Sequence, residues 1–236
     1  MDEMYGLHNM PQYPAGTIAV REGGIQASED NFIITLKGKG GHASAPEIVK
    51  DPLVTAAEII CALQTIVSRN VTPTETAVIS CTEIESDGAH NAIPSNVIIR
   101  GDTRSFTPEM SQLIEKRMEA ICKHICEMNG LECEFTYTHE FAPTFNWKDN
   151  VQYVVKAAKA VVGEEHVIEN CPPTMGSEDF GHFIQNVPGC FVFLGSKRDG
   201  EEAIPLHNSC FDYNDDILVT GAEFFAELVR ERLVKV

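Results

Sequence analysis

Residues 30–47 read DNFIITLKGKGGHASAPE, and this stretch determines the fold of the region around it. Its first seven residues are mostly apolar or β-branched, which predicts a strand over 30–36. The glycine-rich run 38–41 ends that strand, and Pro46-Glu47 leads into a helix over about 51–68, where apolar residues recur every three or four positions. A strand, a glycine turn and a helix therefore begin this part of the chain.

The pattern continues with two strands, a helix and a last strand. We expect strands over 75–85 and 95–106, a helix from 108 to about 129, and a strand over 131–137. Thr107-Pro108-Glu109 is a helix-start signature, and Gly130 is a typical helix stop. The order β-α-β-β-α-β is that of a ferredoxin-like domain, with two helices on one face of a sheet. Its free sheet edge often pairs with a second copy.

The flanking segments have a different pattern. Residues 17–20 and 190–194 are predicted strands, and 151–162, 177–185 and 215–234 are predicted helices. This is an α/β arrangement with few elements before the inserted domain. We therefore expect an α/β fold in which an incomplete domain, residues 1–28 and 143–236, surrounds a ferredoxin-like domain over 29–142.

The composition excludes several functional classes. The 236 residues contain 18 Lys and Arg against 35 Asp and Glu, a net charge of −17. Such a surface repels phosphate backbones, so we expect no nucleic-acid partner. No apolar run approaches the roughly 18 residues of a membrane span, and the N-terminus is acidic, so we expect no membrane partner and a cytoplasmic location.

Eight cysteines are scattered through mostly apolar segments. In a chain of this length they are typical of buried thiols in a reducing compartment rather than of a disulfide framework. Cys122-x-His124-x-Cys126 resembles a metal motif, but positions two apart on a helix point away from each other. We interpret this motif as ordinary helix packing.

Two histidines are candidate ligands. His8, in GLHN, and His207, in IPLHN, are both expected in loops at strand ends, where ligands are often held. Taken singly, however, a loop histidine is more often exposed to solvent than a ligand. Two histidines alone also cannot complete a zinc site, which needs three or four ligands.

Three further polar residues allow two interpretations each. His42 follows a glycine pair and either occupies a strand-to-helix turn incidentally or is presented at a domain edge to polarise a carbonyl oxygen. Asn91 lies in a segment, HNAIPSN, that ordinarily forms a turn. Arg104, late in the third strand, either pairs with a neighbouring carboxylate or clamps the carboxylate of a substrate.

The segment MGSEDF, 175–180, is the sharpest local motif. Ser177 is predicted to cap a helix whose first turn contains Glu178 and a second acid. Gly176 would leave backbone N–H groups open to an anion. A helix cap with no ligand is equally consistent with these residues.

Five segments together resemble a known family. GLHNMPQYPAGTIAVREG (6–23), KGKGGHASAPE (37–47), HNAIPSNVIIRGDTRSF (90–106), MGSEDF (175–180) and IPLHNSCFDYNDD (204–216) are similar to blocks of the zinc-dependent aminoacylase and carboxypeptidase-G superfamily, in the family's order. The resemblance is to its amidohydrolase branch, which includes hippurate hydrolases, N-acetyl-diaminopimelate deacetylases and indole-acetyl-amino-acid hydrolases.

The resemblance implies a fold and a reaction. The flanks would form a metallopeptidase-type catalytic domain that holds two divalent ions (zinc, manganese, nickel or cobalt), and residues 29–142 would form a lid that makes a homodimer. The complete enzyme would release an amino acid from an N-acyl amino acid, or act on a related peptide, by metal-activated water.

It also implies residue roles. His8 and His207 would be metal ligands, and His42, assisted by Asn91, would stabilise the oxyanion in the partner subunit's site. Arg104 would hold the substrate's carboxylate. The loop residues Gly176, Ser177 and Glu178 would line the substrate pocket.

The chain departs from the family by lacking two upstream blocks. The family's Cys-Gly-His-Asp segment and Glu-Glu pair, which supply metal ligands and the general base, have no counterpart here. Glu164-Glu165 and Glu201-Glu202 are interpreted as solvated surface. We therefore expect the chain to bind few or no metal ions and to be inactive alone. The alternatives are a non-catalytic dimerisation module and one half of a split enzyme.

Overall fold

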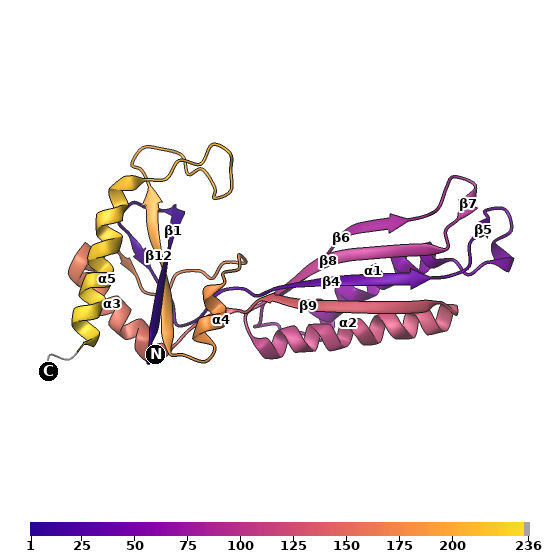
Figure 1. Ribbon diagram of the computed structural model, residues 1–236, viewed down its shortest axis with the longest axis horizontal. Helices are drawn as coiled ribbons and strands as arrows, with labels where there is room; N and C mark the ends of the chain where they lie inside the picture. The colour runs from indigo at the N-terminus through magenta and orange to yellow at the C-terminus, as the bar shows by residue number, and fades with distance from the viewer. Residues whose placement is uncertain (234–236) are drawn as a thin grey trace. The chain divides into compact units, whose positions relative to one another are not determined.

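The computed structural model describes residues 1–233 (Figure 1). The chain divides into two compact units. Unit 1 comprises Met1–Gln26, Thr144–Thr174 and the chain from Glu178 onward, and unit 2 comprises Ala27–Pro143 with Met175–Ser177. The inserted domain expected over 29–142 lies within unit 2, whereas the short loop segment Met175–Ser177, expected with the flanks, packs with unit 2.

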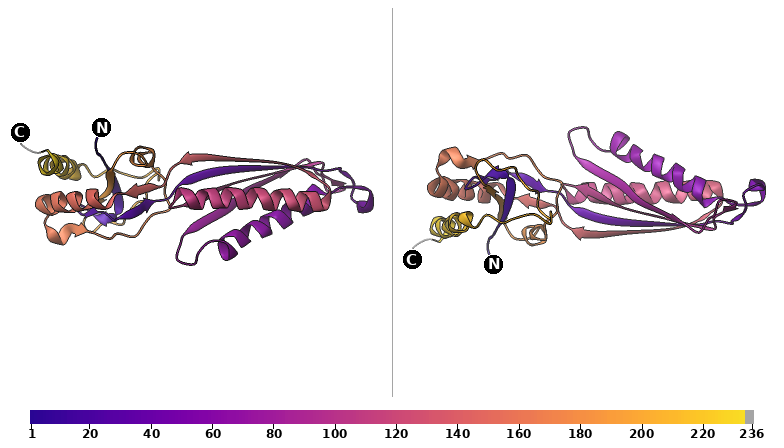
Figure 2. Two further views of the ribbon diagram at one scale, coloured as in Figure 1. Left: turned by 90° about the horizontal axis from the view of Figure 1, so that it is seen from below. Right: turned by 90° about the horizontal axis from the view of Figure 1, so that it is seen from above.

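Unit 2 is an antiparallel sheet covered on one face by two helices (Figures 1 and 2). Its strand order is β6-β8-β4-β9, so β6 and β9 form the edges. Alternate residues of β4, among them Phe32, Ile34 and Leu36, are buried against the helices, as the two-residue period of a strand requires. The elements are β4 (Glu29–Lys37), α1 (Pro52–Arg69), β6 (Ala77–Ser86), β8 (Asn96–Ser105), α2 (Pro108–Asn129) and β9 (Glu132–Phe141).

Both helix ends that the sequence marks for α2 are confirmed. The side chain of Thr107 accepts a hydrogen bond from the Met110 N–H at 3.2 Å, which satisfies a free donor of the first turn. Gly130 ends the helix in the left-handed conformation with a φ of +69°. Asp51 caps α1 in the same way, accepting from the Leu53 N–H at 2.8 Å.

Helix α1 corrects one expectation from the sequence. With 18 residues and a mean hydropathy of 1.2, it is the helix within residues 1–233 whose length and composition would allow a membrane span. Its inward side chains, however, are in the core of unit 2, where Ile59, Leu63 and Ile66 are fully buried. Helix α1 thus contributes its inward side chains to the core of unit 2, while Leu53 and Val54 are exposed.

Unit 1 contains a four-stranded sheet of order β1-β12-β2-β11, with β1 at one edge. Strand β12 is buried along almost its whole length because it has a core on both faces. Its residues Val192 and Leu194 pack with α3 and α5, whereas Phe191 and Phe193 pack on the opposite side. The sheet elements are β1 (Met4–Pro14), β2 (Ile18–Ala19), β11 (Val167–Ile168) and β12 (Gly189–Lys197).

The remaining elements of unit 1 are short or helical. Strand β3 (Gly23–Gln26) pairs with β10 (Thr144–Asn146), and α3 (Lys148–Val162) and α5 (Leu218–Arg232) lie together on one face of the sheet (Figure 1). Helix α4 (Phe180–Ile184) contributes to the other face through Phe180. Short 3-10 turns occupy Pro46–Ile48, Glu164–His166 and Asp215–Ile217.

Two predicted helices differ from the structure. The helix expected over 177–185 begins only at Phe180, and Ser177, the first residue of the predicted helix, belongs to unit 2, where its hydroxyl donates to Glu29. The last helix, expected over 215–234, starts with a 3-10 turn and becomes α-helical at Leu218. Its expected end at Val234 lies outside the described residues.

Candidate active site

His8 lies in the middle of β1, not in a loop at the end of a strand as the sequence suggested. Its Nδ1 is 2.6 Å from the carbonyl oxygen of Asn9. Because a carbonyl only accepts, Nδ1 carries the hydrogen, and in the neutral ring the Nε2 lone pair is free. That arrangement is the one in which a histidine binds a metal through Nε2.

Glu178 is an ionisable neighbour of His8. Burial raises the pKa of the Glu178 carboxyl, and the side-chain hydrogen bond that a protonated Glu178 makes with the Asp179 carboxylate adds to this. The Asp179 backbone N–H, which donates to Glu178 at 3.0 Å, and the His8 ring act in the opposite direction. The residue is half-buried at the start of the segment that leads into α4. The structure therefore places His8 and Glu178, two of the residues singled out in the sequence, near enough to interact electrostatically.

His207 lies in the loop between β12 and α5, and its side chain is exposed. Its backbone φ is +64°, and within the described residues no other non-glycine residue has a positive φ. Such backbone conformations are uncommon and concentrate at functional positions. The preceding Leu206 packs against the apolar cluster that contains Phe193, which fixes the loop on unit 1.

These residues do not form a metal site by themselves. Within residues 1–233, no three His, Cys, Asp or Glu side chains converge closely enough to hold a metal ion. His8 and His207 are chemically suitable ligands, but a stable zinc site needs three or four. Cys122, His124 and Cys126 are also not a site, since the two cysteines are buried and His124 is exposed.

His42 and Asn91 lie side by side at one end of unit 2. Strand β5 (Gly41–His42) pairs with β7 (Ala92–Ile93), and the Ala43 N–H donates to the Asn91 carbonyl at 3.0 Å. The Ser44 N–H donates to His42 Nδ1 at 3.2 Å, so Nδ1 is an acceptor and the hydrogen of the neutral ring is on Nε2. The exposed His42 ring thus presents an N–H donor to solvent.

Arg104 is engaged by two carboxylates. Its Nε donates to Asp102 at 2.6 Å, and its Nη1 is 3.0 Å from an oxygen of Glu29. All three side chains are largely buried, with 21 to 28% of their surfaces exposed. The sequence allowed either a carboxylate partner or a substrate clamp for Arg104, and the structure shows the first arrangement.

Glu29 also holds the MGSEDF loop, a contact that the sequence did not suggest. The Ser177 hydroxyl donates to the same Glu29 oxygen at 2.7 Å, and the Ala27 N–H donates to the Gly176 carbonyl at 3.1 Å. Ser177 therefore does not cap α4, which has no side-chain cap. The correction follows from tertiary contact, since Glu29 and Ser177 are far apart in the sequence.

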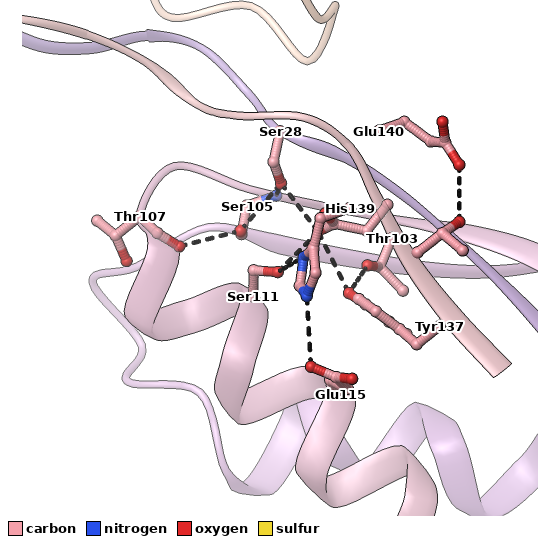
Figure 3. Close-up of polar contacts among 11 residues, drawn as sticks. Ser28, Thr103, Ser105, Thr107, Ser111, Glu115, Tyr137, His139 and Glu140 are labelled. Carbon is pink, nitrogen blue, oxygen red and sulfur yellow. Dashed lines mark hydrogen bonds and ion pairs between the residues drawn. The ribbon is translucent and has the colours of Figure 1, made fainter. Parts of the chain in front are cut away.

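A buried carboxylate at the start of β4, that of Asp30, was also missed. Figure 3 labels the residues that donate to it, Ser28, Ser111, Tyr137 and His139. Asp30 is only 1% exposed. It accepts hydrogen bonds from Ser111 at 2.9 Å, His139 Nδ1 at 3.0 Å, Tyr137 at 3.2 Å and Ser28 at 3.3 Å. These donors offset the cost of removing the carboxylate from water. The network joins β4, α2 and β9 where the chain enters and leaves unit 2, which indicates a structural role.

Comparison with known proteins is consistent with this arrangement. Residues 1–231 match the model of the peptidase family M20/M25/M40. A hippurate hydrolase from Campylobacter jejuni is 36% identical over 232 residues, 98% of this chain and 60% of that protein.

The chain belongs to the peptidase family M20/M25/M40.

Other M20 relatives support the same amidohydrolase branch. An N-acetylcysteine deacetylase from Bacillus subtilis is 33% identical over 95% of this chain and 57% of that protein. The YXEP protein of Bacillus subtilis, described as a dinuclear metal-binding peptidase, has a TM-score of 0.80 at 27% identity over 99% of this chain and 58% of that chain. A structure from methicillin-resistant Staphylococcus aureus has a TM-score of 0.91 at 30% identity, over 100% of this chain and 60% of its own.

This M20 chain thus spans less than two thirds of the relatives it matches. The resemblance to hydrolases and the mixed α/β fold expected from the sequence are confirmed. The relatives establish metal-dependent amide hydrolysis as the general chemistry of the family branch. Roles of single residues in this chain remain predictions.

Proposed function

We propose that this chain is part of a metal-dependent amidohydrolase that releases an amino acid from an N-acyl amino acid or a related peptide. The observation that carries the proposal is the family match along residues 1–231, together with relatives named for the hydrolysis of hippurate and N-acetylcysteine. Both of those compounds are N-acyl amino acids.

His42 and Asn91 are the proposed oxyanion residues. A donor aimed at the carbonyl oxygen stabilises the negative charge that develops on it during attack by water. The Nε2–H tautomer of His42, set by the Ser44 N–H, is the form that can donate such a hydrogen bond. We expect these residues to act on a substrate held by the partner subunit of a homodimer formed through unit 2, whose edge strands are β6 and β9.

Arg104 and the loop residues Gly176, Ser177 and Glu178 are the proposed substrate contacts. A guanidinium binds a carboxylate with two parallel hydrogen bonds. Because Asp102 and Glu29 already engage Nε and Nη1 of Arg104, a substrate carboxylate must bind the remaining donors or displace Glu29. In the proposed role, the substrate carboxylate therefore competes with Glu29 for the Arg104 guanidinium.

His8 and His207 are the proposed metal ligands. Since the described residues form no complete site, we expect further ligands and the general base to come from other polypeptide. We accordingly expect the chain alone to bind well under one metal ion and to be inactive. The metal content after dialysis against zinc or manganese, measured together with hippurate hydrolysis, tests this. Two bound ions and chelator-sensitive turnover would show that the chain is complete.

A matched pair of variants tests the oxyanion role in an assembled, active enzyme. His42→Ala is expected to reduce kcat about 10²–10³-fold, the usual effect of removing one oxyanion donor. His90→Ala changes an exposed histidine near the same turn and is expected to leave kcat unchanged. Equal effects of the two substitutions would contradict the assignment of His42.

A second candidate function is a non-catalytic dimerisation module, favoured by the lack of a complete ligand set within residues 1–233. Such a protein would form dimers through unit 2 and bind no metal even when the missing ligands are supplied in trans. Sedimentation analysis together with metal content separates the two functions, because only the amidohydrolase gains metal on assembly.

A further inference from the structure

Three cysteines come together in the core of unit 2, and the proposed function uses none of them. Cys122 and Cys126 are one turn apart on the same face of α2 and are fully buried. Cys133 is on β9 directly opposite Leu36, a fully buried residue of β4, so its side chain shares the face of the sheet that the helices cover. We call Cys122, Cys126 and Cys133 the thiol cluster.

The turn between α2 and β9 holds the cluster together. Gly130 reverses the chain, and the Leu131 N–H donates to the Cys126 carbonyl at 2.9 Å. The strand therefore runs back along the helix that precedes it, and Cys133 packs against the core cluster that contains Cys122 and Cys126. All eight cysteines of the chain are free.

The three thiols differ in reactivity. Hydrogen bonds from Cys122 and Cys126 lower the pKa of the Cys133 thiol. The hydrogen bond to Cys133, followed by burial, raises the pKa of Cys122 and of Cys126. Cys133 is also the only member of the cluster that is partly exposed. Since the thiolate is the nucleophile, Cys133 is the member that a small oxidant in water reaches and that reacts first.

We propose that the thiol cluster is a site of reversible oxidation at which Cys133 forms a disulfide with Cys122 or Cys126. The oxidant is a hydroperoxide such as hydrogen peroxide. The Cys133 thiolate attacks one peroxide oxygen and breaks the O–O bond, which leaves a sulfenic acid and hydroxide. A helical thiol then attacks the Cys133 sulfur, the S–S bond forms, and the sulfenic oxygen leaves as water with both protons. The peroxide is reduced to two waters, and two thiols are oxidised.

The geometry favours pairing over further oxidation. A sulfenic acid with a neighbouring thiol condenses to a disulfide, and Cys133 packs against a core that contains two such thiols, Cys122 and Cys126. The exposed cysteines, Cys61 and Cys210, are not part of the cluster. In a reducing compartment such a bond would be transient, as regulatory disulfides of cytosolic proteins are.

Peptide mapping of the purified protein tests the proposal. The starting protein is Cys61→Ser/Cys210→Ser, which removes the exposed thiols. It is treated with a small excess of hydrogen peroxide, alkylated and digested with trypsin without reduction. Lys123 separates Cys122 from the other two, because Cys126 and Cys133 share the peptide 124–148. A Cys122–Cys133 bond therefore links two peptides, whereas a Cys126–Cys133 bond removes two hydrogens from one peptide. Either product, reversed by dithiothreitol, supports the proposal.

Variants identify the reactive member. Cys133→Ala is expected to abolish disulfide formation, whereas Cys122→Ala or Cys126→Ala alone leaves pairing with the other helical thiol. Circular dichroism of each reduced variant checks that it is folded. If a variant does not fold, the peptide map of the starting protein alone shows whether Cys133 forms the disulfide. The proposal is overturned if Cys133 is recovered unmodified or only as a sulfinic acid, or if the disulfide persists without Cys133.

Discussion

One carboxylate oxygen of Glu29 forms an ion pair with Arg104 and accepts a hydrogen bond from the Ser177 hydroxyl. Its position makes it the link between the end of β8 and the MGSEDF loop. A carboxylate engaged by a guanidinium and a hydroxyl, in a partly buried site, is shielded from the solvent screening that weakens surface pairs. The conformation of this loop therefore depends on a residue far from it in the sequence.

Glu29→Gln is expected to loosen the loop. The amide keeps the shape of the side chain but removes its charge, so the contacts with Arg104 and Ser177 weaken. We expect faster amide hydrogen exchange over residues 174–179, with unchanged exchange in α2. The matched control is Glu134→Gln. Glu134, on β9, forms an exposed ion pair with Lys37 of β4, and its substitution is expected to leave the loop unaffected. Equal exchange of the loop in the Glu29 variant and the original protein would contradict the proposed link.

Glu3 is expected to make stability depend on pH. Arg232 donates two hydrogen bonds to the Glu3 carboxyl, one from Nε at 2.8 Å and one from a second guanidinium nitrogen. These bonds lower the pKa of the Glu3 carboxyl below its ordinary 4.5. A lowered folded-state pKa means that the stabilisation is fully present above about pH 4.5 and is lost as the pH falls through the folded-state pKa. The difference in Tm between the original protein and Glu3→Gln should accordingly shrink below about pH 4.5. A constant difference down to pH 3 or so would exclude this linkage.

At the scale of elements, β8 depends on a glycine at its centre. A Cβ built on Gly101 would lie 2.0 Å from the Ser80 carbonyl oxygen of β6 and 2.5 Å from the Phe32 ring of β4. Real contacts of this kind are not that short, so either the strand pairing or the core must shift. Gly101 thereby sets how closely the central strands of unit 2 approach one another.

Gly101→Ala is expected to destabilise unit 2 by about 1–3 kcal/mol, the usual cost of overpacking a core. Gly221→Ala, in helix α5, is the control because its Cβ meets only the Leu194 side chain at 3.4 Å. That change is expected to stabilise unit 1 by up to about 1 kcal/mol, since alanine favours a helix more than glycine does. Urea unfolding followed by circular dichroism measures both. Gly101→Ala with unchanged stability would show that β8 can shift freely.

At the scale of the whole molecule, the two units differ in how completely they are packed. Strand β1 is an edge strand, and beside it a hollow of about 600 Å³ is lined by Tyr5, Phe225 and Val229 among others. Phe225 and Val229 are 37% and 52% exposed, which is high for large apolar side chains of an amphipathic helix. In unit 2, by contrast, β4 is paired on both sides and its inward residues are buried.

Amide hydrogen exchange should reveal this difference. We expect β1 and α5 to exchange faster than β4 and α2, because local opening there breaks fewer contacts. Mass spectrometry of peptides from both units, over a range of exchange times, measures the ratio directly. Uniform protection of the two units would mean that unit 1 is as well packed as unit 2.

The β-α-β-β-α-β order, the cap at Thr107 and the stop at Gly130 follow from residues close to one another in the chain. The family resemblance also rests on local segments, and it is confirmed. Periodicity, capping and turn chemistry are local properties, so the sequence by itself determined these features.

The tertiary structure alone decided which distant residues meet. Strand register and the way a helix lies on its sheet decide the pairing of Glu29 with Arg104 and Ser177, the donors around Asp30, and the packing of Cys133 against the core that contains two helical thiols. His8 likewise proved to be inside a strand because β1 pairs with β12, nearly the length of the chain away. Such pairings are selected by burial summed over many residues, and no short stretch of sequence contains that information.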